Sequence, residues 1–290
     1  MKDPLAASKQ SAPDPGSSAD LQDTDHRPMA VDHSLIQVQD LTLAYGSTPI
    51  MRDLNFEVAK GEVLIIMGGS GSGKSSLLKS MIGLLPPVKG KVLYKTTNFW
   101  SATDIQRQQL RRRMGVLYQN GALWSSMTLA ENIALPLEVY TELTPAQIGD
   151  IASLKLNLVG LAGQEEIYPA SLSGGMRKRA ALARAMALDP ELLFFDEPSS
   201  GLDPISARRL DELILELQSS LGTTMVVVTH DLDSIFTIGT RAVFLDAAEK
   251  TMTEIGDPRV LRDNSPNQVV REFLSRSESR KQKTQAQTQT

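Results

Sequence analysis

Apolar and polar residues alternate with different periods along this chain. Residues 36–43 alternate in polarity, which predicts a half-exposed antiparallel strand. Three later runs are apolar at every position, as in central strands of a sheet that is covered on both faces: Leu192 to Phe195, Met225 to Val228 and Val243 to Leu245. Helical patterns separate the strand-like runs, so the expected fold class is α/β.

The middle of the chain differs from the rest. Residues from about 102 to 188 show mostly helical patterns, punctuated by Pro136, Pro145 and Pro169. We expect a helical subdomain in this range, inserted between two parts of a core domain that spans residues 34–257.

The ends of the chain divide into tails and one short helix. Residues 1–33 are rich in Ser, Asp, Ala and Pro, and residues 276–290 carry a Gln/Thr repeat, so we expect both tails to be disordered. Residues 258–275 are expected to form a helical extension, because the apolar residues of its last part share one side of a helix. That helix packs either on its own core or on a second copy of the chain.

A phosphate-binding loop is the strongest chemical signal. Residues 68–75 match the pattern G-x-x-x-x-G-K-S/T, an apolar strand-like run precedes them, and helical spacing follows. Such a loop cradles phosphates with its backbone N–H groups, while Lys74 reaches the β- and γ-phosphates and the Ser75 hydroxyl binds Mg²⁺. A flexible Gly/Ser-rich turn would not need this strand-loop-helix context. The expected nucleotide-binding residues here are Gly68, Gly69, Ser70, Gly71, Ser72, Gly73, Lys74, Ser75 and Ser76.

Composition narrows the class of protein. The chain has 290 residues with 41% hydrophobic and 22% charged, which permits one well-cored domain with tails. A net charge of −4 gives no sign of nucleic-acid binding, and the lack of cysteine excludes disulfides and thiolate metal sites. No uninterrupted apolar stretch approaches the roughly 20 residues that span a bilayer, so we do not expect the chain itself to form a membrane pore.

Two adjacent carboxylates follow the apolar run that begins at Leu192. Asp196 and Glu197 would lie at the carboxyl edge of a sheet, where open α/β sheets bind ligands. Asp196 suits Mg²⁺, held through water, and Glu197 could orient an attacking water or accept its proton. A helix cap or solvated edge is the alternative for such a pair, and the phosphate-binding loop favours the metal and water roles.

A third motif lies between the phosphate-binding loop and the Asp-Glu pair. Leu172 to Met176, Leu-Ser-Gly-Gly-Met, precede a helical run and resemble the LSGGQ signature of ABC-type ATPases. Gln119, the Asp-Glu pair, residues 200–203 and His230 complete the family's order, and the resemblance covers about residues 35 to 255. It implies an ABC-type nucleotide-binding domain: a P-loop NTPase (RecA-like) core with an antiparallel β-subdomain and an inserted α-helical subdomain.

The resemblance also implies roles for single residues. Tyr45 would stack on adenine, with core packing as its alternative, and His230 would hydrogen-bond the γ-phosphate unless it is an incidental histidine at a strand end. Asp203 would communicate across a dimer, and it is also a turn residue before proline. The implied catalytic residues are Lys74, Gln119, Glu197 and His230. The implied metal ligands are Ser75, Gln119 and Asp196.

The signature implies a partner copy. Ser173, Gly174 and Gly175, at a helix N-terminus, would form a second anion site that closes over the γ-phosphate held by the other copy. Two ATP molecules would then lie in a head-to-tail dimer.

Met176, where the family usually has glutamine, sharpens the resemblance. Together with residues 119–124 and 177–185, it is similar to the ATPase of Mla-type, MCE-associated lipid transporters of Gram-negative envelopes. That resemblance implies ATP-driven phospholipid transport linked to outer-membrane lipid asymmetry, at the cytoplasmic face of the inner membrane. The implied partners are a membrane permease, a periplasmic MCE-type protein and a small cytoplasmic accessory subunit.

Surface predictions concern the segment 119–127 and two basic clusters. We expect that segment, with Leu123 and Trp124 exposed, to meet the permease; the alternative places Trp124 in the helical subdomain's own core. Residues 111–113 and 177–179 are basic, and we interpret both clusters as solvated helix faces rather than nucleic-acid sites.

Three other functions remain open at this stage. The chain could serve a transporter of another cargo, such as an amino acid or a metal. A non-transport ABC protein acting on nucleic acid or ribosomes is disfavoured by the single cassette and the negative net charge. A regulatory module with an inactive site is opposed by the intact Lys74, Asp196, Glu197 and His230.

Overall fold

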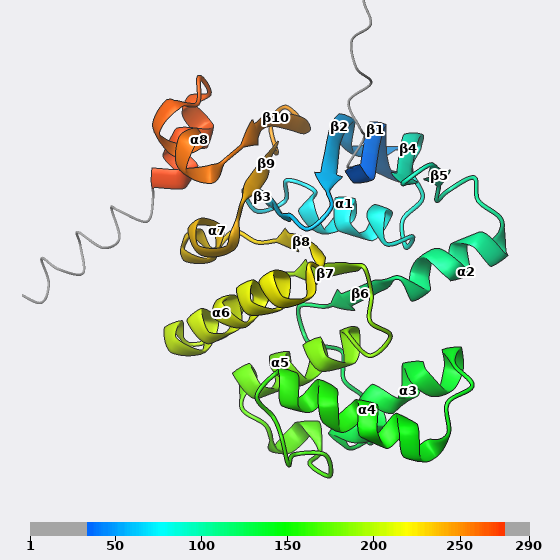
Figure 1. Ribbon diagram of the computed structural model, residues 1–290. Helices are drawn as coiled ribbons and strands as arrows, with labels where there is room; N and C mark the ends of the chain where they lie inside the picture. The colour runs from blue at the N-terminus through cyan, green and yellow to red at the C-terminus, as the bar shows by residue number, and fades with distance from the viewer. Residues whose placement is uncertain (1–33, 276–290) are drawn as a thin grey trace, which may run out of the picture. The chain divides into compact units, whose positions relative to one another are not determined.

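The computed structural model describes residues 34–275, and the tails expected at 1–33 and 276–290 lie outside the described residues. Within this part of the chain, the strands form two sheets (Figure 1). The smaller sheet is antiparallel, and its strands in spatial order are β2 (Thr48–Ala59), β1 (Ser34–Tyr45), β4 (Lys89–Tyr94) and β5 (Thr97–Asn98).

The larger sheet carries the carboxyl edge on which the site is built. Its strands in spatial order are β10 (Thr251–Gly256), β9 (Arg241–Asp246), β3 (Val63–Gly68), β8 (Thr224–Val228), β7 (Leu192–Asp196) and β6 (Met114–Leu117). All neighbours are parallel except β10, which pairs antiparallel with β9 at one edge. The apolar runs predicted as central strands are β7, β8 and β9.

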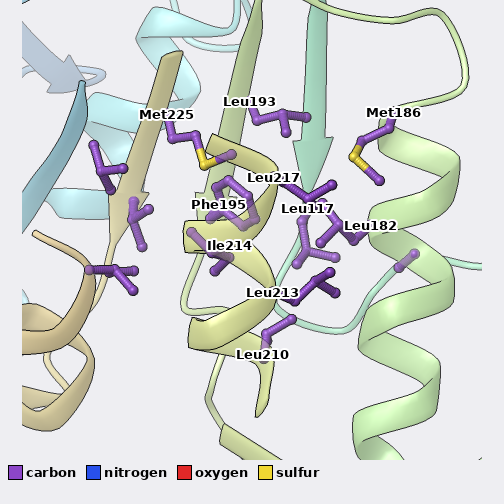
Figure 2. Packing of buried hydrophobic residues seen from close by; sticks show 14 of the residues in the cluster. Leu117, Leu182, Met186, Leu193, Phe195, Leu210, Leu213, Ile214, Leu217 and Met225 are labelled. Carbon is purple, nitrogen blue, oxygen red and sulfur yellow. The ribbon is translucent and has the colours of Figure 1, made fainter. Parts of the chain in front are cut away.

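Strand β3 is shared between two hydrophobic cores. Its odd-numbered residues Val63, Ile65 and Met67 face a core built with helices, and Leu64 and Ile66 face a core built with the antiparallel sheet. Helix α1 (Lys74–Met81) adds its apolar side to the second core. Figure 2 shows part of the first core, where leucine and isoleucine side chains of one helix pack on strand residues such as Phe195. Complete burial of β3 fixes the position of the loop that follows it.

The range 102–188 contains helices and one strand of the sheet. Three of its helices begin with a capping box at Thr103, Thr128 and Thr144, which explains where each starts. Because β6 lies within the range and pairs with β7, the wholly helical part follows β6. The helical elements here are α2 (Asp104–Arg112), α3 (Leu129–Tyr140), α4 (Pro145–Leu158), the 3₁₀ turn η1 (Pro169–Ser171) and α5 (Gly174–Ala185).

Helices after β7 cover the first core and end the described chain. They are α6 (Pro204–Leu221), α7 (Leu232–Ile238), α8 (Pro258–Asn264) and a final helical stretch at residues 268–275. In that stretch Val270, Phe273 and Leu274 are buried in the first core, and the Phe273 ring meets the Phe244 ring edge-on at 5.3 Å. The helix therefore packs on its own core. No helix within residues 34–275 is both long and apolar enough to cross a membrane.

Candidate nucleotide-binding site

The loop between β3 and α1 has two positions that only glycine fits. Gly68 has φ 149°, and a Cβ there would lie 2.3 Å from the carbonyl oxygen of Leu245. Gly73, the N-cap of α1, has φ 84°, and a Cβ there would lie 2.6 Å from Cγ of Met51. The backbone of β9 and a side chain of β2 thus leave no room for a Cβ at these two positions, and the loop leads directly into the N-terminus of α1, whose free N–H groups can bind an anion.

Lys74 lies inside this loop. Its ammonium donates hydrogen bonds to the carbonyl oxygens of Gly68 (3.0 Å) and Gly69 (2.9 Å), and the side chain is buried. Burial lowers the pKa of Lys74, while the carboxylates of Glu197 and Asp196 act in the opposite direction. The cation is thereby held where an anion cradled by the loop would meet it.

Two oxygen donors meet beside the loop. Asp196 ends β7, and its Oδ1 accepts a hydrogen bond of 3.2 Å from the Ser75 hydroxyl at the start of α1. A carboxylate and a hydroxyl side by side next to a phosphate cradle are the oxygen ligands that Mg²⁺ prefers.

Glu197 and His230 form a pair at the same edge. Glu197 Oε1 lies 2.8 Å from Nδ1 of His230, which follows β8. The Glu197 backbone has φ 48°, an uncommon conformation for a residue with a side chain, and its N–H donates to the Val228 carbonyl at 2.8 Å. The carboxyl group is therefore aimed by two strands, which suits a group that orients water.

Gln119 approaches from the end of β6. Its amide nitrogen donates to the Ser200 hydroxyl at 3.3 Å, which joins the segment after β6 to the segment after β7. The ammonium of Lys178, on α5, donates to the carbonyl oxygen of Gln119 and, at 3.3 Å, to that of Glu197.

The signature residues begin helix α5. Ser173 is its N-cap and accepts a hydrogen bond of 3.2 Å from the Met176 N–H, while Gly174 and Gly175 form the first turn. The first N–H groups of a helix have no partner within it, so this end can bind an anion. Asp203 caps α6 in the same way, accepting from the N–H groups of Ile205 and Ser206 at 3.0 Å. A hydrogen bond with the Ser206 side chain, followed by these backbone bonds, lowers the pKa of Asp203.

One cleft brings most of the expected site residues together. It has a volume of about 1990 Å³, and its lining includes Tyr45, the loop from Gly68 to Ser76, Gln119, Glu197 and His230. Tyr45 is 52% exposed, so it does not serve as a core residue. Ser173, Gly174, Gly175 and Asp203 are not among the residues that line this cleft.

Comparison with known proteins decides the family. Residues 51–200 match the family model described as ABC transporter. The chain is 41% identical to "Probable ribonucleotide transport ATP-binding protein mkl" of Mycobacterium leprae, over 83% of this chain and 68% of that protein. It is 39% identical to the intermembrane phospholipid transport system ATP-binding protein MlaF of Escherichia coli K12, over 83% of this chain and 88% of that protein. The chain belongs to the ABC transporter family.

A solved structure agrees with this ABC assignment. The dimeric post-hydrolysis state of the ATP-binding cassette MJ0796, bound to ADP and Pi, superposes with a TM-score of 0.69 at 28% identity, covering 77% of this chain and 98% of that one. The expected fold, an ABC nucleotide-binding domain with an antiparallel sheet, is thus confirmed. The resemblance to Mla-type ATPases is confirmed as well, and the chain is an ABC-type ATPase subunit that binds ATP.

Two surface predictions for this ABC ATPase need correction. Lys178 was expected on a solvated face with its basic neighbours, yet it is only 6% exposed, because one position of a helical triplet turns inward. Leu123 was expected to be exposed, and it is partly buried against the first core. Trp124, in contrast, is 57% exposed and not part of the helical core. Residues 111–113 are exposed as expected.

Sequence reasoning missed two residues that the ABC fold brings to the site. Lys178 reaches the backbone of both Gln119 and Glu197. Ser200, the first residue of the motif at 200–203, accepts the hydrogen bond of the Gln119 side chain. The one sequence hint for Lys178 is burial, because it shares a helix face with Ala181 and Leu182, whereas its backbone partners cannot be read from the sequence.

Proposed function

We propose that this chain hydrolyses ATP as the subunit of an inner-membrane ABC transporter that moves phospholipid, in a system that maintains outer-membrane lipid asymmetry. The observation that carries the chemistry is the Glu197 carboxylate, paired with His230 at the sheet edge where Lys74 lies. The observation that supports the cargo is the likeness to MlaF over 88% of the length of the Escherichia coli protein.

Mg²⁺ fits the oxygen donors of the site. Ser75 and Asp196 would hold it, with Gln119 as a further ligand, and Mg²⁺ keeps several waters and substrate oxygens besides few protein ligands. The described residues contain no group of three or more His, Asp or Glu that could hold a metal. When bound, Mg²⁺ neutralises charge on the phosphates of the substrate ATP.

The remaining work falls to the chain's own side chains. Tyr45 offers a ring face for the adenine, and the N–H groups from Gly68 to Ser76 with Lys74 hold the phosphates. Glu197 orients the attacking water and accepts its proton, and His230 keeps that carboxylate in place while it contacts the γ-phosphate. Gln119 lies in the segment after β6 and contacts the segment after β7 through Ser200.

A second copy of the chain completes the site in this proposal. Ser173, Gly174, Gly175 and Asp203 lie outside the lining of the cleft, although the N-terminus of α5 has free N–H groups that can bind an anion. A head-to-tail dimer would place this helix end on the γ-phosphate held by the partner. The similarity to a dimeric ATP-binding cassette supports this arrangement.

The further partners follow from the phospholipid assignment. We propose a membrane permease that docks near Trp124, a periplasmic MCE-type protein and a small accessory subunit, with the chain at the cytoplasmic face of the inner membrane. The domain division proposed with it is an ATPase domain at residues 34–257 with its helical insert, followed by the extension at 258–275.

A second cargo has support of its own. The relative mkl, described as a ribonucleotide transport ATP-binding protein, is as similar to this chain as MlaF is. Ribonucleotide transport is therefore the alternative that experiments must separate from phospholipid transport.

The test of the hydrolytic role is Glu197→Gln in the full chain. We expect ATP binding to persist and turnover to fall roughly 100-fold or more, because the amide cannot accept a proton. Glu138→Gln, at an exposed position on α3, is the control. Normal turnover in Glu197→Gln, measured as phosphate release, would refute the assignment.

The test of the cargo is purification of the chain from its native membranes in mild detergent. A permease, an MCE-type protein and phospholipid in the same complex would support the proposal, especially if phospholipid stimulates its ATPase. A complex stimulated by ribonucleotides and not by phospholipid would establish the alternative cargo, and would leave the ATPase chemistry intact.

A further inference from the structure

Lys178 is a buried cation on the helix that begins with the signature. Only 6% of its surface is exposed, and its ammonium contacts the backbone of two other segments. There it donates hydrogen bonds to the carbonyl oxygens of Gln119 and, at 3.3 Å, Glu197. One side chain thus touches both segments that approach the γ-phosphate in the proposed function.

The Glu197 backbone depends on such support. Its φ of 48° costs free energy for a residue with a Cβ and persists only where the surroundings hold it. The N–H is held by the Val228 carbonyl at 2.8 Å, and the carbonyl is held by the Lys178 ammonium. Loss of the second contact would free the peptide that aims the carboxylate.

Burial and nearby carboxylates have opposite effects on the pKa of Lys178. Removal from water lowers the pKa of Lys178, and the charges of Asp196 and Glu197 act in the opposite direction. A buried cation is costly unless it is well bound, and the two carbonyl oxygens with the two nearby carboxylates supply that binding.

Arg184 provides an internal comparison two turns further along α5. Its guanidinium donates to the carbonyl oxygens of Gly121 and Ala122, so it holds the same loop after β6. The contacts of Arg184 go to that loop, whereas Lys178 also binds the Glu197 backbone. The two residues therefore separate anchoring of the loop from positioning of the carboxylate.

We propose that Lys178 is a positioning residue for ATP hydrolysis: its ammonium ties the signature helix to the backbone of Glu197 and sets the direction of that carboxylate. The inference rests on the proposed hydrolytic role of Glu197. Through this contact, a movement of α5 when the signature closes on a nucleotide would also move the Glu197 backbone.

The experiment compares Lys178→Met with three other variants in the full chain. Lys178→Arg retains a cation, Arg184→Met loosens the loop after β6, and Lys155→Met removes a buried lysine that is paired with Asp189 away from the site. We expect Lys178→Met to lower kcat roughly 10- to 100-fold with little change in the KM for ATP, since it misplaces Glu197 without touching the phosphate loop. Lys178→Arg should restore most of the activity.

A double mutant distinguishes positioning from a merely structural role. If Lys178 acts through Glu197, Lys178→Met should lower the residual turnover of Glu197→Gln no further. An equal loss in that background, an unchanged kcat, or the same loss in Arg184→Met or Lys155→Met would overturn the inference. Normal turnover of Glu197→Gln itself would instead refute the proposed function, so the two failures are distinguishable. Should Lys178→Met fail to fold, Lys178→Gln takes its place in both backgrounds, because it keeps a polar side chain at this buried position but removes the cation. An unchanged kcat in Lys178→Gln would then overturn the inference.

Discussion

Asp211 is a buried carboxyl group that the proposed hydrolysis does not use. It lies on α6, and its Oδ2 accepts a hydrogen bond of 2.8 Å from Ser234 on α7. Burial is the main reason that its pKa rises to about 6, and the charges of Asp231, Asp233 and Glu212 raise it further, while the Ser234 hydrogen bond acts to lower it.

This raised pKa predicts a pH-dependent stability. A carboxyl group whose pKa is higher in the folded state than in the unfolded state stabilises the fold most below the unfolded value, and that contribution is lost as the pH rises through about 6. Asp211→Asn keeps the acceptor for Ser234 without a charge. We expect the variant to gain about 1 kcal/mol relative to wild type between pH 5 and pH 8, after allowance for solvent screening.

Urea unfolding at both pH values measures this difference. Glu216→Gln, at an exposed position on the same helix, should leave the pH dependence nearly unchanged. Parallel curves for wild type and Asp211→Asn would contradict the prediction.

The site residues could be predicted because they belong to sequence motifs. The burial of Lys178 could not, because it depends on tertiary contacts. The loop from Gly68 to Ser75 and the Asp196-Glu197 pair stood out because each carries its own local context. Lys178 did not, because its partners are carbonyl oxygens 59 and 19 residues away, and backbone acceptors leave no trace in a sequence.

At the scale of elements, the helical stretch 268–275 is expected to stabilise the fold through one buried side. Phe273 is 7% exposed and packs on Phe244, whereas Val269 is 52% exposed. Phe273→Ala should cost about 3 kcal/mol of stability, because it removes a buried ring and leaves a cavity. Val269→Ala, on the same helix, should change the free energy of unfolding by less than about 0.5 kcal/mol.

Chemical denaturation of both variants tests this packing. Equal stabilities would mean that the stretch does not anchor to its own core in solution. A dimer that dissociates only in Val269→Ala would instead indicate that the exposed side of the stretch contacts a second copy.

Strands that are apolar throughout were predictable, and strands at the sheet margins were not. β7, β8 and β9 lie in the larger sheet, covered on both faces, and their sequences show it. β2 alternates between buried and exposed residues with several charges, and β10 is only partly buried, so neither stands out. β6 lies among helices in sequence, and only pairing with β7 reveals that it belongs to the sheet.

At the scale of the whole molecule, Trp124 marks the expected contact with a permease. Its backbone is held by Asn132, which is fully buried and bonds both the N–H (2.8 Å) and the carbonyl (3.1 Å) of Trp124. The indole itself is exposed. A rigid backbone with a free aromatic side chain is typical of an interface anchor.

Trp124→Ala should therefore keep the ATPase activity of the isolated chain and bind the permease at least about 10-fold more weakly. Val260→Ala, which is equally exposed on α8, is the control. Pull-down with the permease and transport-coupled ATPase measure the effect. Unchanged coupling, or a chain that no longer folds, would place Trp124 outside the interface.

The pairing of β3 also has a consequence for how the protein is made. The strand before the nucleotide loop is flanked by β8 and β9, whose partners to Ile65 are Val227 and Ala242. Ribosomes deliver those partners some 160 to 180 residues later, so a wholly apolar strand waits unpaired while most of the chain is synthesised. A nascent chain that stops before β9 has the complete loop sequence but lacks the strand that packs beside the loop. It should acquire ATP binding only once β9 has left the exit tunnel.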